Sequence, residues 1–189
     1  MRLFSYVVAA DSGFAPNPFW GILTLACCKP RIRLSAEPGD LLVGLTPSRL
    51  GNAVVYVARV QEKLTFREYW RDKRFTPKRP DMRASSIIQR CGDNIYEPTE
   101  AGSIRQLPSG HSYGLDENSA NKAHDLGGRF VLTSEESSYF GSEAIPLPDR
   151  FSNLIVGRAH RCRFSYPPDS IAGTIHNDAI CGLESPSFL

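Results

Sequence analysis

Asparagine, aromatic and basic side chains gather near the N-terminus in a pattern suited to holding a base or a nucleotide. Asn17 offers a hydrogen-bond donor and an acceptor together, which suits the reading of a base edge. It lies between two prolines, and the flanking aromatic side chains can stack on a base; they are Phe14, Phe19 and Trp20. Basic side chains that can contact phosphate follow at Lys29, Arg31 and Arg33. The block from Phe14 to Asp40 is therefore predicted to form a recognition surface.

Further polar groups occur at residues 93–96, 111–112 and 160–161. In the binding interpretation, Trp20 or Tyr96 stacks on the base and Arg161 adds a phosphate contact. Asn94 and Ser112 then supply polar contacts. The competing interpretation is acid–base catalysis by His111, Asp93 or His160, because histidine titrates near neutral pH. A pocket that gathers these three residues around Asn17 would favour an enzyme, and their separation would favour a binding domain.

The five cysteines do not form a disulfide or metal pattern. Cys27 and Cys28 are adjacent and precede Lys29, whose charge would favour a thiolate. Buried, unreactive cysteine is the favoured interpretation of this pair. The others are scattered at residues 91, 162 and 181, without C-x-x-C spacing and without an H-x-x-x-H pair. We expect no metal site and no cofactor.

Residues 110–114, Gly-His-Ser-Tyr-Gly, match the G-x-S-x-G nucleophile elbow in form. That elbow needs a strand before Ser112 and a helix after it. The flanking residues, 105–109 and 116–118, indicate neither element, so we reject this match. Neither a P-loop nor a strand-coupled G-x-G-x-x-G occurs in the sequence, which leaves P-loop hydrolysis and Rossmann dinucleotide binding unsupported.

The composition is that of an ordinary globular protein. The chain has 189 residues, of which 41% are hydrophobic and 22% charged. The net charge of +2 is unevenly placed, since residues 67–90 hold eight basic residues against three acidic ones. No apolar run approaches the roughly 18 residues that a membrane span needs. We expect a cytoplasmic protein without membrane contact.

Hydrophobic alternation predicts strands at residues 3–9, 41–45, 53–60 and 130–133, with a hairpin across 46–52. Thr65 and Glu68 fit a capping box that starts a short helix with Phe66, Tyr69 and Trp70 along one side. Residues 93–125 are rich in Gly, Ser, Asn and Pro and are predicted to be loop. Residues 151–156 are predicted to form a short helix or strand. The elements together indicate an α+β fold with long loops.

Several blocks of the sequence resemble the nucleotide modification associated domain 2 family. The more specific blocks are Phe14-Ala15-Pro16-Asn17-Pro18-Phe19 and Cys28-Lys29-Pro30 with Ile32-Arg33; shorter ones lie at residues 5–8, 39–40, 93–96, 139–141 and 158–160. The resemblance runs roughly from residue 1 to 165. It implies a bacterial or phage protein linked to DNA base hypermodification. The sequence departs from the family where a small hydroxyl residue is expected near Cys28 and a glycine near Ala159.

A second resemblance, to PUA-like and EVE barrels, concerns the order of elements. A basic segment, Gly39-Asp40, an apolar strand and a second strand before Tyr69-Trp70 follow one another as in those domains. This resemblance implies a PUA-like mixed β-barrel with short flanking helices, of a kind that holds a flipped base in a cleft. We expect one such domain over residues 1–166 and a C-terminal tail over 167–189.

Three hypotheses follow. The first is a non-enzymatic domain that binds DNA or a nucleotide through a modified base. The second is an enzyme that acts on nucleotides or modified bases. The third is a structural or assembly protein without a ligand, in which Asn17→Ala would change stability alone. The oligomeric state is not predicted.

Overall fold

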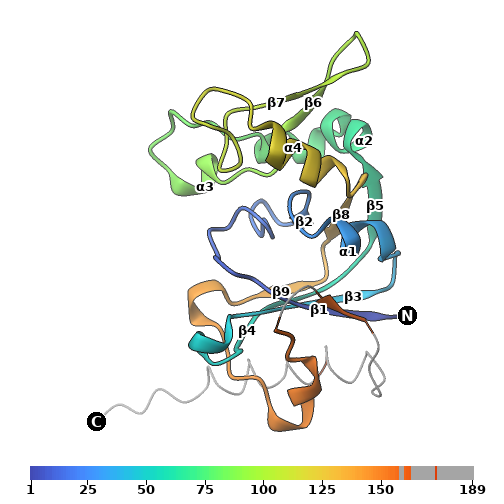
Figure 1. Cartoon of the computed structure of the whole chain (residues 1–189), viewed down its shortest axis with the longest axis vertical. Coiled ribbons are helices and arrows are strands. Elements are labelled where there is room, and N and C mark those ends of the chain that lie inside the picture. Colours follow the sequence, from blue (N-terminus) through green and yellow to red (C-terminus); the bar gives the residue numbers. More distant parts are fainter. Residues whose placement is uncertain (158–159, 163–172, 174–189) are drawn as a thin grey trace. The chain divides into compact units, whose positions relative to one another are not determined.

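The computed structural model describes residues 1–157, 160–162 and 173, and the chain divides into two compact units (Figure 1). Unit 1 consists of Met1–Ala10, Gly39–Arg59 and the described residues of Glu136–Leu189. Unit 2 consists of Asp11–Pro38 and Val60–Glu135. Each unit is formed from segments far apart in the sequence.

Unit 1 is built on a five-stranded sheet in the order β10-β1-β3-β4-β9. These strands are β1 (Leu3–Val7), β3 (Leu41–Leu45), β4 (Val54–Arg59), β9 (Ser137–Tyr139) and β10 (His160–Arg161). β1 and β3 are parallel, and the other neighbours are antiparallel. Short 3-10 helices η1 (Ser48–Leu50), η3 (Gly141–Glu143) and η4 (Asp149–Leu154) complete the unit. Phe151 and Leu154 of η4 pack on the sheet in one apolar core.

Unit 2 contains the antiparallel sheet β2-β8-β5 and the hairpin β6-β7. Its strands are β2 (Leu23–Leu25), β5 (Glu62–Thr65), β6 (Tyr96–Pro98), β7 (Ile104–Gln106) and β8 (Phe130–Ser134). Its helices are α1 (Pro30–Ser35), α2 (Phe66–Arg71), η2 (Lys73–Lys78), α3 (Ile87–Arg90) and α4 (Ser119–Leu126). The core of this unit joins Cys27 to the aromatic side chains Phe14, Phe66, Tyr69 and Tyr96.

The locally encoded elements agree with the sequence patterns. The capping box at Thr65 and Glu68 is confirmed, since the Thr65 hydroxyl accepts from the Glu68 amide and the Glu68 carboxylate accepts from the Thr65 amide. The strands expected at 41–45, 53–60 and 130–133 are present as β3, β4 and β8. The prediction that residues 93–125 are loop is wrong. This stretch contains β6, β7 and most of α4, whose first turn is capped by the Asn118 carboxamide.

The fold class is α+β, as expected, but the PUA-like barrel is not confirmed. Over the described residues, the strand order of each sheet has two ends, so none of the three sheets closes on itself. The expected tail at 167–189 lies outside the described residues except for Gly173. Ala159, near which the sequence departs from the family, and residue 166, the expected end of the domain, also lie outside them. Among the described helices, none has the length and apolar character needed to cross a membrane.

A candidate cysteine, histidine and aspartate site

Cys27 and Cys28 lie in the sharp turn that joins β2 to α1 in unit 2. The turn begins after Leu25 and ends where Pro30 occupies the first turn of α1. Cys28 and Lys29 have positive backbone φ angles of 59° and 42°. Residues other than glycine rarely adopt this conformation, and it recurs where a chain must aim a functional side chain. A strand, a strained turn and a helix therefore present the Cys28 thiol.

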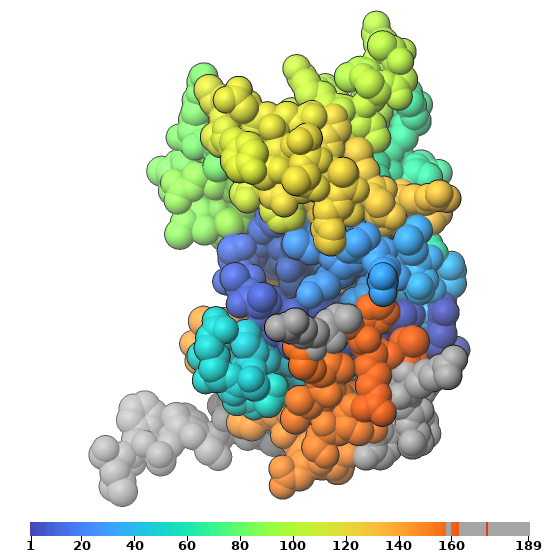
Figure 2. All heavy atoms as spheres, in the orientation of Figure 1, coloured from blue at the N-terminus to red at the C-terminus, as the bar shows by residue number. Residues whose placement is uncertain are grey.

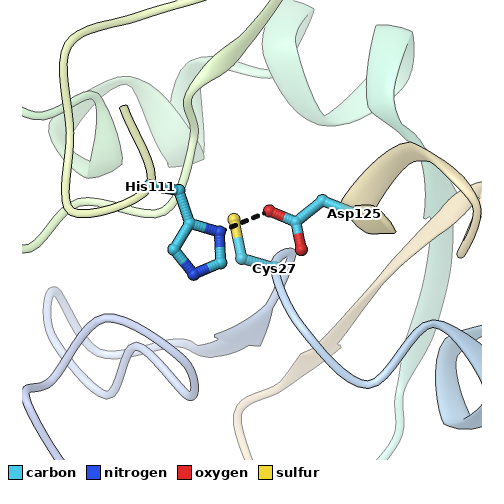
Figure 3. Close-up of side chains that lie close together, drawn as sticks. All are labelled: Cys27, His111 and Asp125. Carbon is cyan, nitrogen blue, oxygen red and sulfur yellow. Dashed lines mark hydrogen bonds and ion pairs between the residues drawn. The ribbon is translucent and has the colours of Figure 1, made fainter. Parts of the chain in front are cut away.

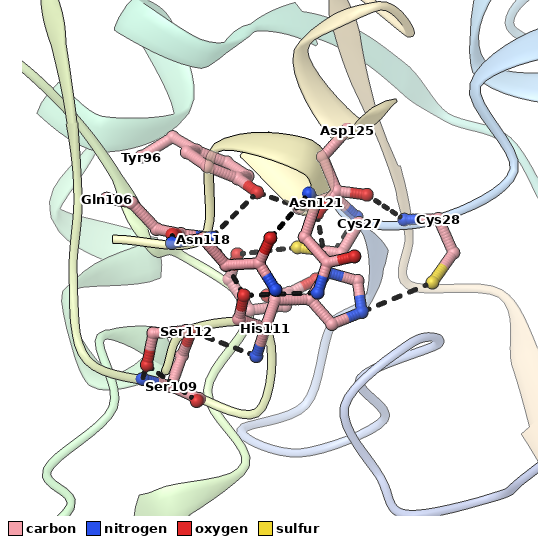
Figure 4. Close-up of polar contacts among 12 residues, drawn as sticks. Cys27, Cys28, Tyr96, Gln106, Ser109, His111, Ser112, Asn118, Asn121 and Asp125 are labelled. Atoms are coloured by element: carbon pink, nitrogen blue, oxygen red, sulfur yellow. Dashed lines mark hydrogen bonds and ion pairs between the residues drawn. The ribbon is translucent and has the colours of Figure 1, made fainter. Parts of the chain in front are cut away.

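The Cys28 thiol faces a histidine that is held by a carboxylate. His111 Nε2 lies 3.6 Å from Cys28 Sγ. On the other side of the ring, His111 Nδ1 lies 2.6 Å from Asp125 Oδ2 (Figures 3 and 4). A thiol, a base and a group that orients the base are thus in contact in that order, which is the geometry of an activated nucleophile.

His111 belongs to the loop between β7 and α4, and its backbone is fixed on both sides. Its amide donates to the Ser109 hydroxyl at 3.3 Å. Its carbonyl accepts from the side-chain amides of Gln106 and Asn121, each at 3.2 Å (Figure 4). The ring also lies against Phe14, with 4.7 Å between centroids. These contacts hold the imidazole in one place before any substrate arrives.

Asp125 lies in the last turn of α4 and is fully buried. Its Oδ1 accepts from the Cys28 amide at 2.6 Å, and its Oδ2 accepts from the Tyr96 hydroxyl at 2.7 Å as well as from His111. Burial raises the pKa of this carboxyl, but the hydrogen bonds from His111 and Tyr96 outweigh burial and leave the pKa below its usual value. Asp125 is therefore ionised at neutral pH.

Burial alone would lower the pKa of His111, but contacts with Asp125 and Cys28 prevail and raise it to about 9. The His111 imidazole is thus largely protonated at neutral pH. The positive ring faces the Cys28 sulfur at 3.6 Å, and reactive cysteines typically occur in surroundings of this kind. Lys29 follows in the chain; burial lowers the pKa of its ammonium group, and negative charge on Cys28 partly offsets that effect.

Arg33 supports this arrangement from within the protein. Its guanidinium is fully buried and donates to the carbonyl oxygens of Cys28 at 2.8 Å, Asp125 at 2.5 Å and Phe130 at 2.7 Å. It packs against Gly128, where a Cβ atom would stand 2.4 Å from the guanidinium carbon. Helices α1 and α4 are in contact, and Figure 2 shows the blue surface of the α1 region meeting the yellow surface of the α4 region. Contact with phosphate, as predicted for Arg33, would require breaking three hydrogen bonds to carbonyls.

Cys27 points into the same cluster from the buried side of the turn. Its Sγ atom, a ring nitrogen of His111 and a carboxylate oxygen of Asp125 all lie within 4.8 Å of one another (Figure 3). Burial, then the charges of Asp125 and Asp93, raise the pKa of the Cys27 thiol well above its usual value. Sequence spacing predicted no metal site because these residues come from three distant segments.

Asn17, the predicted base reader, is fully buried and occupied by protein partners. Its Nδ2 donates to the carbonyls of Gly13 and Cys91, each at 2.9 Å, and its Oδ1 accepts from Lys78 Nζ at 2.6 Å. Lys78 is itself buried, which lowers the pKa of its ammonium group to about 8. These hydrogen bonds would have to break before Asn17 could read a base. Trp20 is 37% exposed, with the Lys78 ammonium 5.6 Å from its ring centroid and the Phe19 ring edge-on to it.

The remaining predicted residues are dispersed. Asn94 is buried and donates to the carbonyls of Tyr69 and Phe75, and Tyr96 is buried against Asp125. The Ser112 hydroxyl lies within hydrogen-bond distance of the carbonyls of Ser109 and Gly114, to which its single hydrogen can be donated. Ser112 lies among turns, without the strand before it and the helix after it that a nucleophile elbow needs. Lys29 is half-buried and Arg31 exposed. His160 and Arg161 belong to β10 of unit 1.

Of the three predicted acid–base residues, Asp93 and His111 both belong to unit 2 but have different hydrogen-bond partners. Asp93 accepts from Thr24, Ala26 and Tyr69, whereas His111 contacts Cys28 and Asp125. His160 belongs to the other unit. The sequence reasoning missed Cys28 as the partner of His111 and missed Asp125 altogether. The apolar run before Cys27 and Pro30 just after Cys28 were the available signs of a strand, turn and helix at this point.

The fold and the site define an α+β protein in which a thiol contacts an imidazole and the imidazole contacts a carboxylate. The chain belongs to the nucleotide modification associated domain 2 family, whose model matches residues 1–175. This match confirms the resemblance found in the sequence and links the chain to nucleotide or DNA modification. No curated protein and no solved structure matches the chain.

Proposed function

We propose that this protein is a cysteine-dependent enzyme that acts on a nucleotide or on a modified base, with Cys28 as the nucleophile. The observation that carries the proposal is the contact of Cys28 Sγ with His111 Nε2 while Asp125 holds His111 Nδ1. The sequence analysis favoured a binding domain without catalysis. By the criterion set from the sequence, the different partners of Asp93 and His111 count for the binding domain. The burial of Asn17 and Arg33 counts against it. The contact of Cys28 with His111, which the sequence did not predict, supports the enzyme alternative.

In this mechanism the proton given up by Cys28 already rests on His111 Nε2 at neutral pH, in keeping with the raised pKa of His111, and Asp125 stabilises the imidazolium. The thiolate sulfur attacks the carbonyl carbon of an ester, amide or thioester group on the substrate and forms a carbon–sulfur bond. The bond to the leaving group breaks, and the leaving group departs with the proton from His111. Water, deprotonated by His111, then attacks the thioester and releases the acid and the Cys28 thiol.

Acyl chemistry is favoured because a thiol is a good nucleophile toward carbonyl carbon and needs only an adjacent base. The family's link to nucleotide modification supports a nucleotide or a base as the substrate. Arg31 is exposed in α1, shortly after Cys28 in the chain, and is a candidate phosphate contact. Trp20 is a candidate stacking residue for a modified base, which would bring the binding and enzyme hypotheses together in one protein.

The test is covalent trapping. The chain is incubated with nucleotides and nucleosides that carry acyl, amide or thioester groups on the base, quenched in acid and analysed by peptide mass spectrometry. We expect an adduct on Cys28, which persists in Cys27→Ala and is lost in Cys28→Ala. An adduct confined to another cysteine, or no adduct from any of these compounds, would contradict the proposal.

A further inference from the structure

Cys27 has no role in the proposed reaction, yet it lies with two members of the site. Its Sγ atom, a His111 ring nitrogen and an Asp125 carboxylate oxygen form a group whose members are all within 4.8 Å of one another. Thiolate, imidazole and carboxylate are the three ligand types that bind zinc in proteins, with metal–ligand distances of about 2.0–2.3 Å. The three atoms can all reach one ion if the 2.6 Å contact between His111 and Asp125 opens slightly and any separation near 4.8 Å closes to less than about 4.4 Å, the sum of two such bonds.

The surroundings of the three residues suit a metal site. Cys27 and Asp125 are fully buried, whereas His111 is partly exposed. Solvent can therefore reach the group at His111 and is excluded from it at Cys27 and Asp125. The Asp125 carboxylate is already oriented by the Tyr96 hydroxyl and the Cys28 amide. Such second partners fix the direction of a ligand and commonly accompany protein metal sites. Three protein ligands and one open position are the usual arrangement of an accessible zinc ion.

The charges also favour a divalent cation. Cys27 as a thiolate and Asp125 as a carboxylate carry two negative charges, which one Zn²⁺ neutralises. Asp93 adds a further negative charge near Cys27. A thiolate ligand selects zinc over magnesium or calcium, which prefer oxygen ligands.

We propose that Cys27, His111 and Asp125 bind Zn²⁺ and that this ion switches off the Cys28 thiol. The inhibitory half of the inference rests on the proposed function. A neutral imidazole bound to metal through Nδ1 carries its remaining proton on Nε2, the nitrogen that faces Cys28. That nitrogen then cannot accept the thiol proton. Metal binding and base catalysis therefore exclude each other, although they use different cysteines.

The adjacent cysteines provide matched variants for the test. The full chain is titrated with Zn²⁺ against a chromophoric chelator, and Cys28 alkylation by iodoacetamide is followed with and without the ion. We expect one Zn²⁺ per chain. Cys27→Ala should weaken binding by more than about 100-fold and leave Cys28 alkylation intact, whereas Cys28→Ala should change the affinity by less than about threefold. Zn²⁺ should slow Cys28 alkylation at least about tenfold in the parent chain, and excess chelator should restore it.

Each outcome separates the two proposals. Zn²⁺ binding that survives Cys27→Ala, or that is lost equally in Cys28→Ala, would overturn the ligand set. Zn²⁺ that binds through Cys27 but leaves Cys28 alkylation unchanged would overturn the inhibition. If acyl nucleotides fail to form a Cys28 adduct while Zn²⁺ still requires Cys27, the proposed function fails and the metal site stands. A thermal melt of each variant shows whether Cys27→Ala has instead unfolded unit 2.

Discussion

Two buried carboxylates flank the turn that holds the cysteines, and their surroundings are alike in two respects. Asp93 and Asp125 each accept a tyrosine hydroxyl, from Tyr69 at 2.6 Å and from Tyr96 at 2.7 Å. Each also accepts a backbone amide of the same short segment, from Ala26 at 3.2 Å and from Cys28 at 2.6 Å. The two carboxylates thus hold the turn from two neighbouring points.

Asp93 and Asp125 differ in their third hydrogen-bond partner. Asp93 accepts from the hydroxyl of Thr24 at 2.8 Å, and both residues are fully buried. Asp125 contacts His111, which is partly exposed and reaches a half-buried thiol. Burial leaves the pKa of Asp93 above its usual value, while the hydrogen bonds of His111 and Tyr96 leave that of Asp125 below. One carboxylate is built to fix the chain, and the other to hold an ionised base.

The largest expected effect is at the cysteines themselves. Cys28→Ala removes the nucleophile, so turnover of an acylated nucleotide should fall by at least about 1000-fold. Cys27→Ala is the matched control and should retain turnover within about tenfold in chelator-containing buffer. Turnover by Cys28→Ala at a rate near that of the parent chain would remove the thiol from the mechanism.

Asp125→Asn and Asp93→Asn test the comparison directly. Asparagine at 125 keeps the size of the side chain but loses the charge that orients and stabilises His111, so Cys28-dependent turnover should fall at least about 100-fold. Asparagine at 93 would turn an amide donor either toward the Tyr69 hydroxyl or toward the Thr24 hydroxyl and the Ala26 amide, which are all donors to Asp93. It should lower the free energy of unfolding by about 1–3 kcal/mol, with turnover per folded molecule little changed. Kinetics and chemical denaturation of both variants check this. Equal losses of turnover in the two variants would contradict the assignment of a structural role to Asp93 and a catalytic role to Asp125.

The raised pKa of His111 predicts a pH-dependent stability. Because the folded-state pKa is about 9 and the unfolded value about 6.5, the stabilising contribution is complete below pH 6.5 and is lost as pH rises through 9. The expected loss is on the order of 3 kcal/mol at most, measured by urea unfolding in chelator between pH 6 and 10. The loss is read as the difference between the profiles of the parent chain and of His111→Gln, because Lys78, whose pKa is about 8, contributes a slope of opposite sign to both. An unchanged pH profile in that variant would show that the titrating group lies elsewhere.

The smallest effect concerns the support behind the turn. Alanine at Gly128 would collide with the guanidinium of Arg33, whose hydrogen bonds hold the Cys28 and Asp125 carbonyls. Gly128→Ala should therefore destabilise the protein by about 1–2 kcal/mol, as an overpacked site does. Gly157→Ala is the control, since a Cβ at Gly157 meets nothing within 4 Å. Thermal melts compare the two, and equal melting temperatures would argue against the Arg33 support.

Local patterns were sufficient where neighbours in the sequence determine the structure. The alternating apolar residues of β4 and the reciprocal hydrogen bonds of Thr65 and Glu68 need no remote partner. The site is different, because Cys28 and His111 are 83 positions apart and Asp125 lies a further 14 beyond. The sequence named His111 but could not pair it with Cys28. Asn17 was predicted to read a base because its side chain offers a donor and an acceptor, but Lys78, 61 positions away, donates to that acceptor inside the protein.

The most direct test of the central claim is the reactivity of Cys28 in the metal-free chain. Iodoacetamide labelling followed by peptide mass spectrometry gives separate rates for Cys28, for half-buried Cys91 and for exposed Cys162. We predict that Cys28 reacts at least about tenfold faster than both near pH 7, despite being less exposed than Cys162, and that His111→Gln removes this advantage. A Cys28 that reacts no faster than Cys91, or whose rate His111→Gln leaves unchanged, would contradict the account.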